Sequence, residues 1–490
     1  MSAVITVPMH RRSVALLLAM WVAAAAHAAD RGPNIVHIVA DDLGFRDVGF
    51  NGCKDIKTPN LDRLAAEGAT FTQFYVQPMC TPTRAALMTG RYPFRYGLQT
   101  IVIPTAAAYG LDTSEWLMPQ CLGEAGYGTA IIGKWHLGHA DRKFWPRQRG
   151  FDYQYGAMIG ELDYFTHDEH GVLDWFRNNE PVKEEGYTTN LLGDDAVRFI
   201  GRQSADKPFY LYLTFNAPHT PYQAPESYVA KYAGIPDSTR RTYAAMVDCL
   251  DENVGKVVAA LDAKGLRGNT LILFHSDNGG TTDKRFSGQM ADVSKITLPC
   301  DNGPYRSGKG SLFEGGCRVA AFANWPGHIK PQRVNEIIHA VDVYPTFAAL
   351  AGATTSKCKP LDGVNVWKTI AEGAPSPRTE VLYNVEPFRA AVRQGDWKLI
   401  WRTTLPSSVD LYNLAEDPCE TKNVAAAHPD KVAAMQARLE AASKEAAKPL
   451  ALLYLVENAM KANVPLLPTD EGFFSDSDES SAPPKIGNGH

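Results

Sequence analysis

The sequence lacks a membrane-spanning hydrophobic run and lacks a strong excess of either charge. Its long apolar stretch, residues 14–26, has thirteen residues, whereas a membrane helix needs about 20. Lysine and arginine together number 49, aspartate and glutamate number 54, and the formal net charge is −5. This balance gives none of the basic footprint that nucleic-acid binding requires. We therefore expect neither stable insertion into a membrane nor a nucleic-acid partner.

The sequence also lacks internal repeats and any cysteine spacing typical of a zinc site. None of its eight cysteines belongs to a Cys-x-x-Cys pair, so a structural zinc is not predicted. In an oxidising compartment Cys300 could pair with Cys317 and Cys358 with Cys419, although connectivity does not follow from sequence. A chain of 490 residues, 45% of them hydrophobic, can bury a large core without such bridges. These features indicate a large globular protein.

The N-terminus has the features of a secretory signal peptide. Two arginines precede residues 14–26, and a small-x-small cleavage site, Ala26-His27-Ala28, follows them. We predict a signal peptide over residues 1–28 and export to the periplasm or the extracellular space. An uncleaved membrane anchor is the alternative interpretation.

Short apolar segments alternate with amphipathic helical segments over most of the chain. Such alternation is typical of an α/β fold in which helices sandwich a mainly parallel sheet, and we expect that fold here. The sequence predicts a helix that begins at Thr58-Pro59 and stops at Gly68, a helix over residues 240–264, and strands over residues 34–40, 129–132, 209–215 and 270–274.

The pattern changes after about residue 375. Four short strands, at residues 380–384, 389–393, 397–401 and 409–412, are followed by a helix over residues 428–446. We therefore predict a catalytic domain over residues 29–375 and a smaller α+β domain with an antiparallel sheet over residues 376–462. Residues 463–490 are rich in Pro, Ser, Asp and Glu, and a disordered tail is expected there.

Polar side chains with metal-binding or acid–base chemistry follow the predicted parallel strands. Ligands bind beyond the carboxyl ends of the strands in open parallel sheets, so these side chains are predicted to share one site. Their carboxylates and amide are oxygen ligands, which suit Ca²⁺ or Mg²⁺ better than zinc. Taken singly, adjacent aspartates also cap helices, and Asp-Asn-Gly-Gly is often a plain turn. The residues are Asp41, Asp42, Lys134, His136, His219, Asp277 and Asn278.

A further candidate, Cys80, precedes a predicted short helix. Thr81 suits the N-cap of that helix, Pro82 its first position and Gly90 its end. Backbone N–H groups and the helix dipole at such a terminus favour anions. An unmodified cysteine there is predicted to be a nucleophile with a lowered pKa, and the alternative is a buried structural cysteine.

Residues 80–91 carry Cys-x-Pro-x-Arg followed by Leu-x-Thr-Gly-Arg, which resembles the signature of the type I sulfatases. Thr83 stands where Ser is commoner in that family. The resemblance extends over roughly residues 33–450 and is closest to the arylsulfatase B (N-acetylgalactosamine-4-sulfatase) subgroup, through segments 77–82 and 359–370. Further segments that resemble sulfatase motifs are residues 41–44, 133–138, 217–221, 276–280 and 308–316.

The resemblance implies an alkaline-phosphatase-like fold, a sulfated sugar or glycan as substrate, and a particular chemistry. A formylglycine-generating enzyme would oxidise Cys80 to formylglycine, whose hydrated form would attack sulfur. Ca²⁺ would be held by Asp41, Asp42, Asp277, Asn278 and the modified Cys80. The implied roles of the others are charge stabilisation by Lys134 and Lys309, orientation and deprotonation of the nucleophile by Arg84 and His136, and protonation of the leaving oxygen by His219 with Lys309.

Three alternatives remain open on sequence alone. An aryl sulfatase, or a phosphonate or phosphate ester hydrolase of the same superfamily, has similar motifs, although the phosphonate enzymes tend to carry Asp-His where this chain has Asp277-Asn278. A non-catalytic glycan-binding relative is the third. The aromatic residues of segment 151–190 could stack on sugar rings or belong to an ordinary structured loop.

Overall fold

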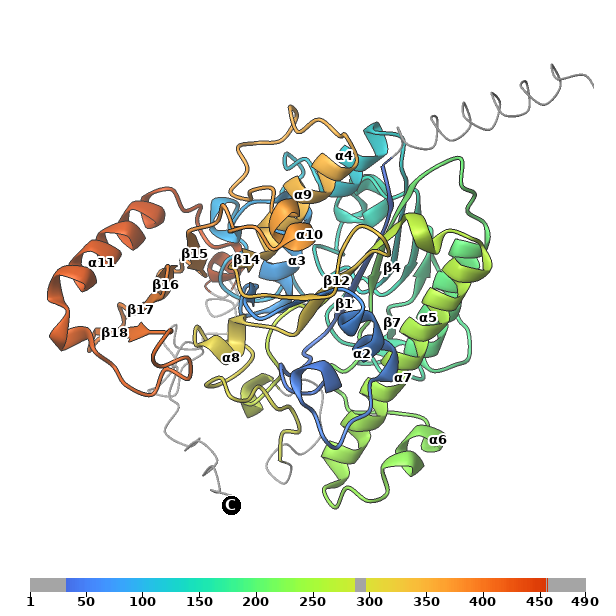
Figure 1. The fold of residues 1–490 in the computed structure, drawn as a ribbon, viewed down its shortest axis with the longest axis horizontal. Coiled ribbons are helices and arrows are strands. Elements are labelled where there is room, and N and C mark those ends of the chain that lie inside the picture. The colour runs from blue at the N-terminus through green and yellow to red at the C-terminus, as the bar shows by residue number, and fades with distance from the viewer. Residues whose placement is uncertain (1–31, 287–296, 455, 457–490) are drawn as a thin grey trace, which may run out of the picture.

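The computed structural model describes residues 32–286, 297–454 and 456 (Figure 1). The predicted signal peptide and the predicted disordered tail lie outside the described residues. Among those that are described, no helix combines the length and the apolar composition needed to cross a membrane.

A ten-stranded sheet forms the centre of the molecule. Its order is β13-β2-β12-β11-β1-β10-β4-β5-β8-β9, and the five strands from β11 to β5 run parallel. The strands β12, β8 and β9 pair antiparallel with their neighbours, so the sheet is mixed at both sides of a parallel centre. The strands are β1 (Asn34–Ala40), β2 (Ala69–Phe71), β4 (Gly128–Gly133), β5 (Tyr153–Gly156), β8 (Phe176–Arg177), β9 (Glu180–Pro181), β10 (Phe209–Thr214), β11 (Thr270–Ser276), β12 (Ala321–Asn324) and β13 (Gln332–Val334).

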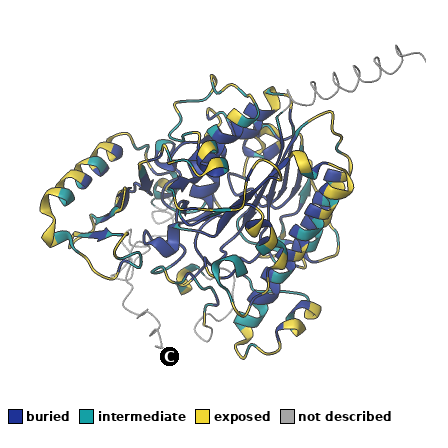
Figure 2. Ribbon diagram, viewed as in Figure 1, coloured by how far each residue is buried: buried dark blue, intermediate teal, exposed yellow. Residues whose placement is uncertain are grey.

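Helices cover both faces of this sheet, as expected from strands that are apolar throughout. Along β1, Val36 and Ile38 pack with one layer of helices, whereas Ile35 and Val39 pack with the other. Figure 2 shows the strands buried between the two layers. The first layer is α2 (Pro59–Ala66), α5 (Thr188–Gly201), α6 (Glu226–Val229) and α7 (Ser238–Ala263); the second is α3 (Cys80–Thr89), α4 (Met118–Glu124), α9 (Val343–Leu350) and α10 (Trp367–Glu372).

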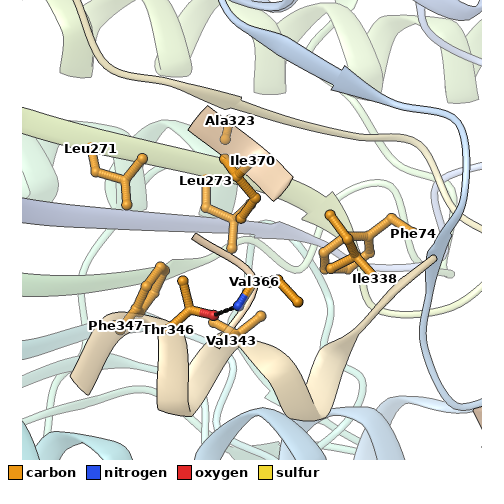
Figure 3. A pocket seen from close by; sticks show the side chains of 10 residues that line it. All are labelled: Phe74, Leu271, Leu273, Ala323, Ile338, Val343, Thr346, Phe347, Val366 and Ile370. Carbon is orange, nitrogen blue, oxygen red and sulfur yellow. Dashed lines mark hydrogen bonds between the residues drawn. The ribbon is translucent and has the colours of Figure 1, made fainter. Parts of the chain in front are cut away.

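The contact between the sheet and α9 is lined by apolar side chains and one threonine (Figure 3). Leu271 and Leu273 from β11 face Phe347 of α9 and Ile370 of α10 across it. Its one polar side chain, Thr346, accepts a hydrogen bond from the backbone N–H of Val366 at 3.0 Å. This interior holds helices in place and offers no polar group to a ligand.

A separate four-stranded antiparallel sheet follows the main sheet in the chain. It is formed in order by β15 (Glu380–Tyr383), β16 (Arg389–Gln394), β17 (Trp397–Arg402) and β18 (Ser408–Asn413). Helix α11 (Pro429–Lys444) packs on β16 and β17. The predicted α/β fold with a smaller antiparallel sheet near the C-terminus is therefore confirmed, while the exact domain boundaries stay a prediction. The remaining elements are the short strands β3 (Phe74–Tyr75), β6 (Asp168–Glu169), β7 (Val172–Leu173) and β14 (Ile338–His339), and helix α8 (Glu314–Cys317).

The two cysteine pairings that the sequence leaves open are not formed, because all eight cysteines are free thiols. Cys317 faces the carbonyl of Ser311 at 3.5 Å, and Cys358 contacts the hydroxyl of Tyr344 at 3.1 Å. The predicted N-cap of the short helix after Cys80 is wrong. Helix α3 begins at Cys80, with Met79 at the N-cap. Thr81 does not cap this helix because its hydroxyl donates to the carbonyl of His136 at 3.0 Å.

Candidate active site

The carboxyl ends of adjacent parallel strands bring the acidic residues together. Asp41 and Asp42 follow β1, and Asp277 and Asn278 follow its neighbour β11. The backbone N–H of Asp42 donates to Oδ1 of Asp277 at 3.2 Å, and Nδ2 of Asn278 donates to Oδ1 of Asp42 at 2.7 Å. All four side chains are buried, so the chain concentrates acidic oxygens where water cannot solvate them.

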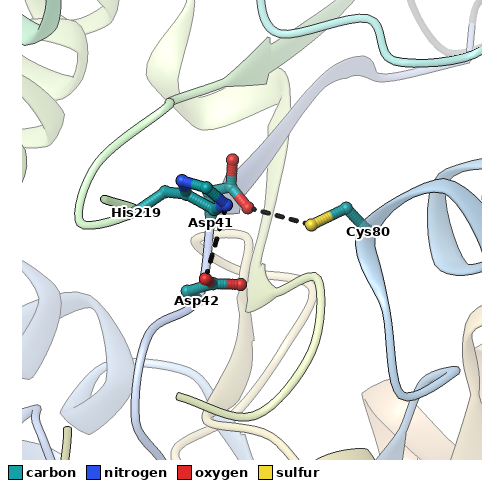
Figure 4. A group of neighbouring side chains, drawn as sticks. All are labelled: Asp41, Asp42, Cys80 and His219. Atoms are coloured by element: carbon teal, nitrogen blue, oxygen red, sulfur yellow. Dashed lines mark hydrogen bonds and ion pairs between the residues drawn. The ribbon is translucent and has the colours of Figure 1, made fainter. Parts of the chain in front are cut away.

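Helix α3 presents Cys80 to this acidic group (Figure 4). Its Sγ atom lies 3.4 Å from Oδ1 of Asp41, and ligand atoms of Asp41, Asp42, Cys80 and His219 all lie within 4.8 Å of one another. Burial first, and then the charges of Asp277 and Asp41, raise the pKa of the Cys80 thiol well above its ordinary value. The prediction of a low-pKa thiolate is therefore wrong, because the helix terminus is outweighed by burial beside carboxylates.

Arg84 lies one turn after Cys80 on α3 and binds the aspartates at the strand ends. Its Nε and Nη2 donate to Oδ2 of Asp277 at 3.1 and 2.8 Å, and Nη2 lies 3.6 Å from Oδ2 of Asp41. Its Nη1 donates to the carbonyl of Lys134 at 3.0 Å and to the hydroxyl of Thr214 at 2.5 Å. Arg84 thus connects the ends of β11, β1, β4 and β10 to the helix that carries Cys80.

Two buried lysines pair with the two adjacent aspartates. Lys134 Nζ lies 2.5 Å from Oδ2 of Asp41, and Lys309 Nζ lies 2.8 Å from Oδ2 of Asp42. Lys309 Nζ also lies 3.0 Å from Nε2 of His219. Burial opposes the charge of Lys309, but the carboxylate of Asp42 outweighs it and raises the pKa of Lys309. Lys309 is therefore a charged donor to the histidine.

His219 is neutral and both of its ring nitrogens have partners. Nδ1 lies 2.7 Å from the carbonyl of Thr220, so it carries the proton, and Nε2 accepts from Lys309. Burial and the charge of Lys309 lower the pKa of His219 to about 4. The imidazole is accordingly engaged by protein groups rather than free to bind a metal.

His136 is placed by an unusual backbone conformation. Its φ is +56°, so the chain turns at His136 and does not continue as an extended strand. The ring Nε2 lies 3.2 Å from the carbonyl of Ile103 and donates to it, whereas Nδ1 is buried without a partner among the described residues. Burial, with Lys134 and Arg84 nearby, lowers the pKa of His136 well below its ordinary value. Nδ1 is therefore an available base.

The oxygens fit a hard divalent cation. Oδ1 of Asn278 is buried and has no partner among the described residues, although a buried amide oxygen normally has one. Burial and the neighbouring Asp41 raise the pKa of Asp277, which is the mark of carboxylates crowded together. A cation held by Asp41, Asp42, Asp277 and Asn278 would satisfy both, and oxygen donors of this kind suit Ca²⁺.

A cavity of about 200 Å³ opens onto Cys80, His136, His219 and Lys309. Most of the other residues around the cavity could not be predicted from the sequence, because they belong to no recognisable motif. The aromatic residues Tyr155, Tyr164 and Trp175 lie in the hydrophobic core instead, so the sugar-stacking interpretation is wrong for them. The other residues around the cavity are Met79, Val102, Ile103, Pro104, Thr105, Ile159, Gly160, Glu161, Glu169, Arg285 and Phe286.

The ten predicted site residues thus lie in one buried cluster at the strand ends. Cationic side chains and a buried cysteine at the carboxyl edge of a mainly parallel sheet indicate a site for anionic esters. The family model described as "Sulfatase" matches residues 33–353, and a model described as "N-sulphoglucosamine sulphohydrolase, C-terminal" matches residues 307–447. The chain belongs to the sulfatase family and is a sulfatase enzyme.

Individual relatives agree with this assignment. Arylsulfatase J of Mus musculus is 37% identical over 389 residues, which cover 77% of this chain and 62% of that protein. N-acetylgalactosamine-6-sulfatase of Mus musculus is 35% identical, with 81% of this chain and 77% of that protein covered. The structure of Ps i-CgsB in complex with k-i-k-neocarrahexaose has a TM-score of 0.77 and 36% identity, over 86% of this chain and 94% of that chain. The resemblance to the arylsulfatase B subgroup stays a prediction.

The packing of Gly160 on His136 generates a test. A Cβ built on Gly160 would lie 2.7 Å from Nε2 of His136, so Gly160→Ala must displace the ring. We expect kcat for sulfate release to fall roughly 10- to 100-fold, because misplacing a reacting group by about 1 Å has that effect. Gly123→Ala is the control, since its Cβ meets nothing within 4 Å. Equal kcat for the two variants would contradict the role given to the ring position.

Proposed function

We propose that this sulfatase removes sulfate from a sulfated sugar or glycan, using a formylglycine made from Cys80 and a bound Ca²⁺. The observation that carries the proposal is the buried contact of Cys80 with Asp41, at the N-terminus of α3 and beside two lysines. The candidate substrate is N-acetylgalactosamine-4-sulfate, a proposal that rests on the subgroup resemblance. Sugar as the substrate class is supported by a relative named N-acetylgalactosamine-6-sulfatase and by a similar structure bound to a neocarrahexaose.

The raised pKa of Cys80 supports conversion rather than use of the thiol itself. A protonated thiol is a weak nucleophile, and burial beside Asp277 and Asp41 keeps this one protonated. Formylglycine, when formed, supplies a hydrated aldehyde whose hydroxyl is the nucleophile. The conversion needs a formylglycine-generating enzyme as a partner during maturation. Export to the periplasm or the extracellular space is part of the proposal and rests on the predicted signal peptide.

The metal has a defined set of proposed ligands. Asp41, Asp42, Asp277 and Asn278 would hold Ca²⁺ together with the modified Cys80. When bound, the cation supplies Lewis-acid stabilisation of negative charge on a sulfate oxygen. The protein's own task is to keep four buried oxygens in place, and Arg84 does so through its two bonds to Asp277.

His136 and Lys134 act on the nucleophile side of the cavity. Nε2 of His136 donates a hydrogen bond to the carbonyl of Ile103, so Nδ1 carries no proton. Nδ1 takes the proton of the attacking hydroxyl. Lys134 pairs with Asp41 and stabilises the negative charge that develops on the sulfate. Arg84 orients the group at position 80 from the same helix.

Lys309 and His219 act on the leaving-group side. Lys309 holds a proton between Asp42 and Nε2 of His219. We propose that this pair delivers the proton to the departing sugar oxygen, with Lys309 as its source because His219 is neutral. General acid catalysis of this kind contributes roughly 10²- to 10⁴-fold.

Substrate preference tests the proposed function. We expect kcat/KM for N-acetylgalactosamine-4-sulfate to exceed that for a simple aryl sulfate by about tenfold or more, equivalent to about 1.4 kcal/mol of transition-state binding. The corresponding phosphate monoester is expected to be poorer still, because Asn278 stands where phosphonate hydrolases tend to carry histidine. Release of inorganic sulfate and phosphate measures both. Activity restricted to aryl sulfates or phosphate esters would refute the sugar assignment, and no release from any ester would favour a glycan-binding role.

Modification of Cys80 is testable by peptide mass spectrometry of the protein from its native host. The peptide that contains residue 80 should carry an aldehyde, and Cys80→Ser should abolish activity because no aldehyde forms on serine by this route. Cys53→Ser, at a partly exposed cysteine away from the cavity, should leave activity unchanged. An active preparation with only unmodified Cys80 would contradict the proposal.

Calcium binding is testable without any activity measurement. Ca²⁺ at 100 times its Kd should stabilise the protein by about 2.7 kcal/mol, seen as a rise in Tm that EGTA reverses. Asp277→Asn should lose most of this response because it removes a ligand charge. Asp194→Asn, at a carboxylate paired with Lys256 on the surface, is the matched control. A calcium response that is the same in both variants would place the ion elsewhere.

A further inference from the structure

The segment that carries Lys309 lies between the main sheet and the C-terminal sheet. Its backbone is tied on the catalytic side by two hydrogen bonds. The N–H of Lys309 donates to the carbonyl of Gly280 at 3.1 Å, and the N–H of Gly310 donates to the carbonyl of Pro78 at 2.8 Å. The segment also folds on itself, since the N–H of Gly315 donates to the carbonyl of Arg306 at 2.9 Å. Lys309 and Glu314 therefore belong to one short hydrogen-bonded segment.

Glu314 ends this segment in a fully buried group of charges. Its Oε1 lies 3.0 Å from Nζ of Lys398, which comes from β17 of the C-terminal sheet. Its Oε2 accepts from the hydroxyl of Tyr75 at 2.6 Å and lies 3.3 Å from Nη1 of Arg318. The backbone N–H of Glu314 donates to Oε2 of Glu420 at 2.6 Å. Lys398 closes the group, because its Nζ also lies 2.9 Å from Oε1 of Glu420.

Charge balance makes Lys398 the centre of this group. Glu314, Glu420 and Lys398 are all completely buried. Burial opposes ionisation of Glu314, but Lys398 and Arg318 lower its pKa to about 2, whereas burial raises the pKa of Glu420 to about 7. Of the cations around Glu314, Lys398 lowers its pKa most, and Lys398 also bridges Glu314 to Glu420. An uncompensated buried charge is strongly unfavourable, so the Glu314 end cannot move away from Lys398.

The C-terminal sheet also contacts the segment that leads into Cys80. Nε2 of Gln77 donates to the carbonyl of Leu382 at 3.1 Å, and Oε1 of Gln77 accepts from the N–H of Asn384 at 2.8 Å. The backbone N–H of Gln77 in turn donates to the hydroxyl of Thr83 in α3 at 3.0 Å. The same sheet therefore fixes the chain on both sides of the Pro78–Gly310 hydrogen bond.

We propose that Lys398 is a positioning residue for catalysis. It holds Glu314, and through the segment of residues 309–314 it sets the position of Lys309 against Asp42 and His219. The inference rests on the proposed role of Lys309 in protonating the leaving oxygen. Lys398 itself is fully buried and is not one of the residues around the cavity, so it acts only through Lys309.

A double-mutant cycle on kcat with Lys398→Met and Lys309→Ala tests the proposal. We expect Lys398→Met to lower kcat roughly 10- to 100-fold and Lys309→Ala to lower it roughly 10²- to 10⁴-fold. If Lys398 acts through Lys309, the double variant should be no slower than Lys309→Ala alone. Effects that multiply in the double variant would overturn the proposal.

The leaving-group dependence separates positioning from a general loss of structure. For a series of aryl sulfates of differing phenol pKa, loss of proton donation makes kcat fall more steeply as the phenol pKa rises. Lys309→Ala should steepen this dependence, and Lys398→Met should steepen it in the same direction. A lower Tm with the wild-type dependence would make Lys398 merely structural. Arg438→Met, which removes the ion pair between Arg438 of α11 and Glu380 of β15, is the control and should leave both kcat and the dependence unchanged.

Two further outcomes distinguish a failure of the proposal for Lys398 from a failure of the proposed function. If Lys398→Met does not fold, Glu314→Gln replaces it in the cycle, because it removes the ion pair between residue 314 and Lys398 while leaving Lys398 paired with Glu420. If Lys309→Ala leaves the leaving-group dependence unchanged, the proton-donor role of Lys309 fails. The cycle on kcat then still decides the inference, since coupling supports positioning of Lys309 and additivity refutes it.

Discussion

The structure depends on the neutralisation of charge at a place that water does not reach. Asp41, Asp42 and Asp277 meet at the ends of two adjacent strands, and each is at most 2% exposed. Carboxylates in such surroundings are tolerated only when cations and hydrogen-bond donors face them. Arg84, Lys134 and Lys309 supply those cations from three separate parts of the chain. Each charged residue of the site is therefore held in place by residues of opposite charge.

This requirement explains the features of the individual residues. Lys309 stays charged despite burial because Asp42 is beside it, and burial together with the charge of Lys309 keeps His219 neutral. Burial, and then the carboxylates of Asp277 and Asp41, keep the thiol of Cys80 protonated, so the environment that suits a metal ion is unfavourable to a thiolate. A second group of buried charges lies where the C-terminal sheet meets the Lys309 segment. There Lys398 pairs with Glu314 and Glu420.

Much of the fold was predictable because its signals are local. The apolar runs at the centre of the sheet, the helix that ends near Ala66 and the four strands after residue 375 all lie where the sequence places them. Local signals also failed in identifiable ways. Thr81 is a residue type that commonly caps helices, but its hydroxyl donates a hydrogen bond to the carbonyl of His136. For the aromatic residues of segment 151–190 the sequence leaves sugar stacking and an ordinary structured loop open, and Tyr155, Tyr164 and Trp175 are core residues.

The class of fold, the residues of the site and the family can be predicted from the chain alone, because periodicity and motif spacing are properties of short segments. The folded structure is needed to show which charges face one another, which nitrogen of His136 is unprotonated, and that Cys80 is not a thiolate. Arg84 and Asp277, for example, are 193 positions apart, and Glu314 and Lys398 are 84 apart. Electrostatic interactions of this kind depend on distance in space and on burial, and neither is written in the local pattern of the chain.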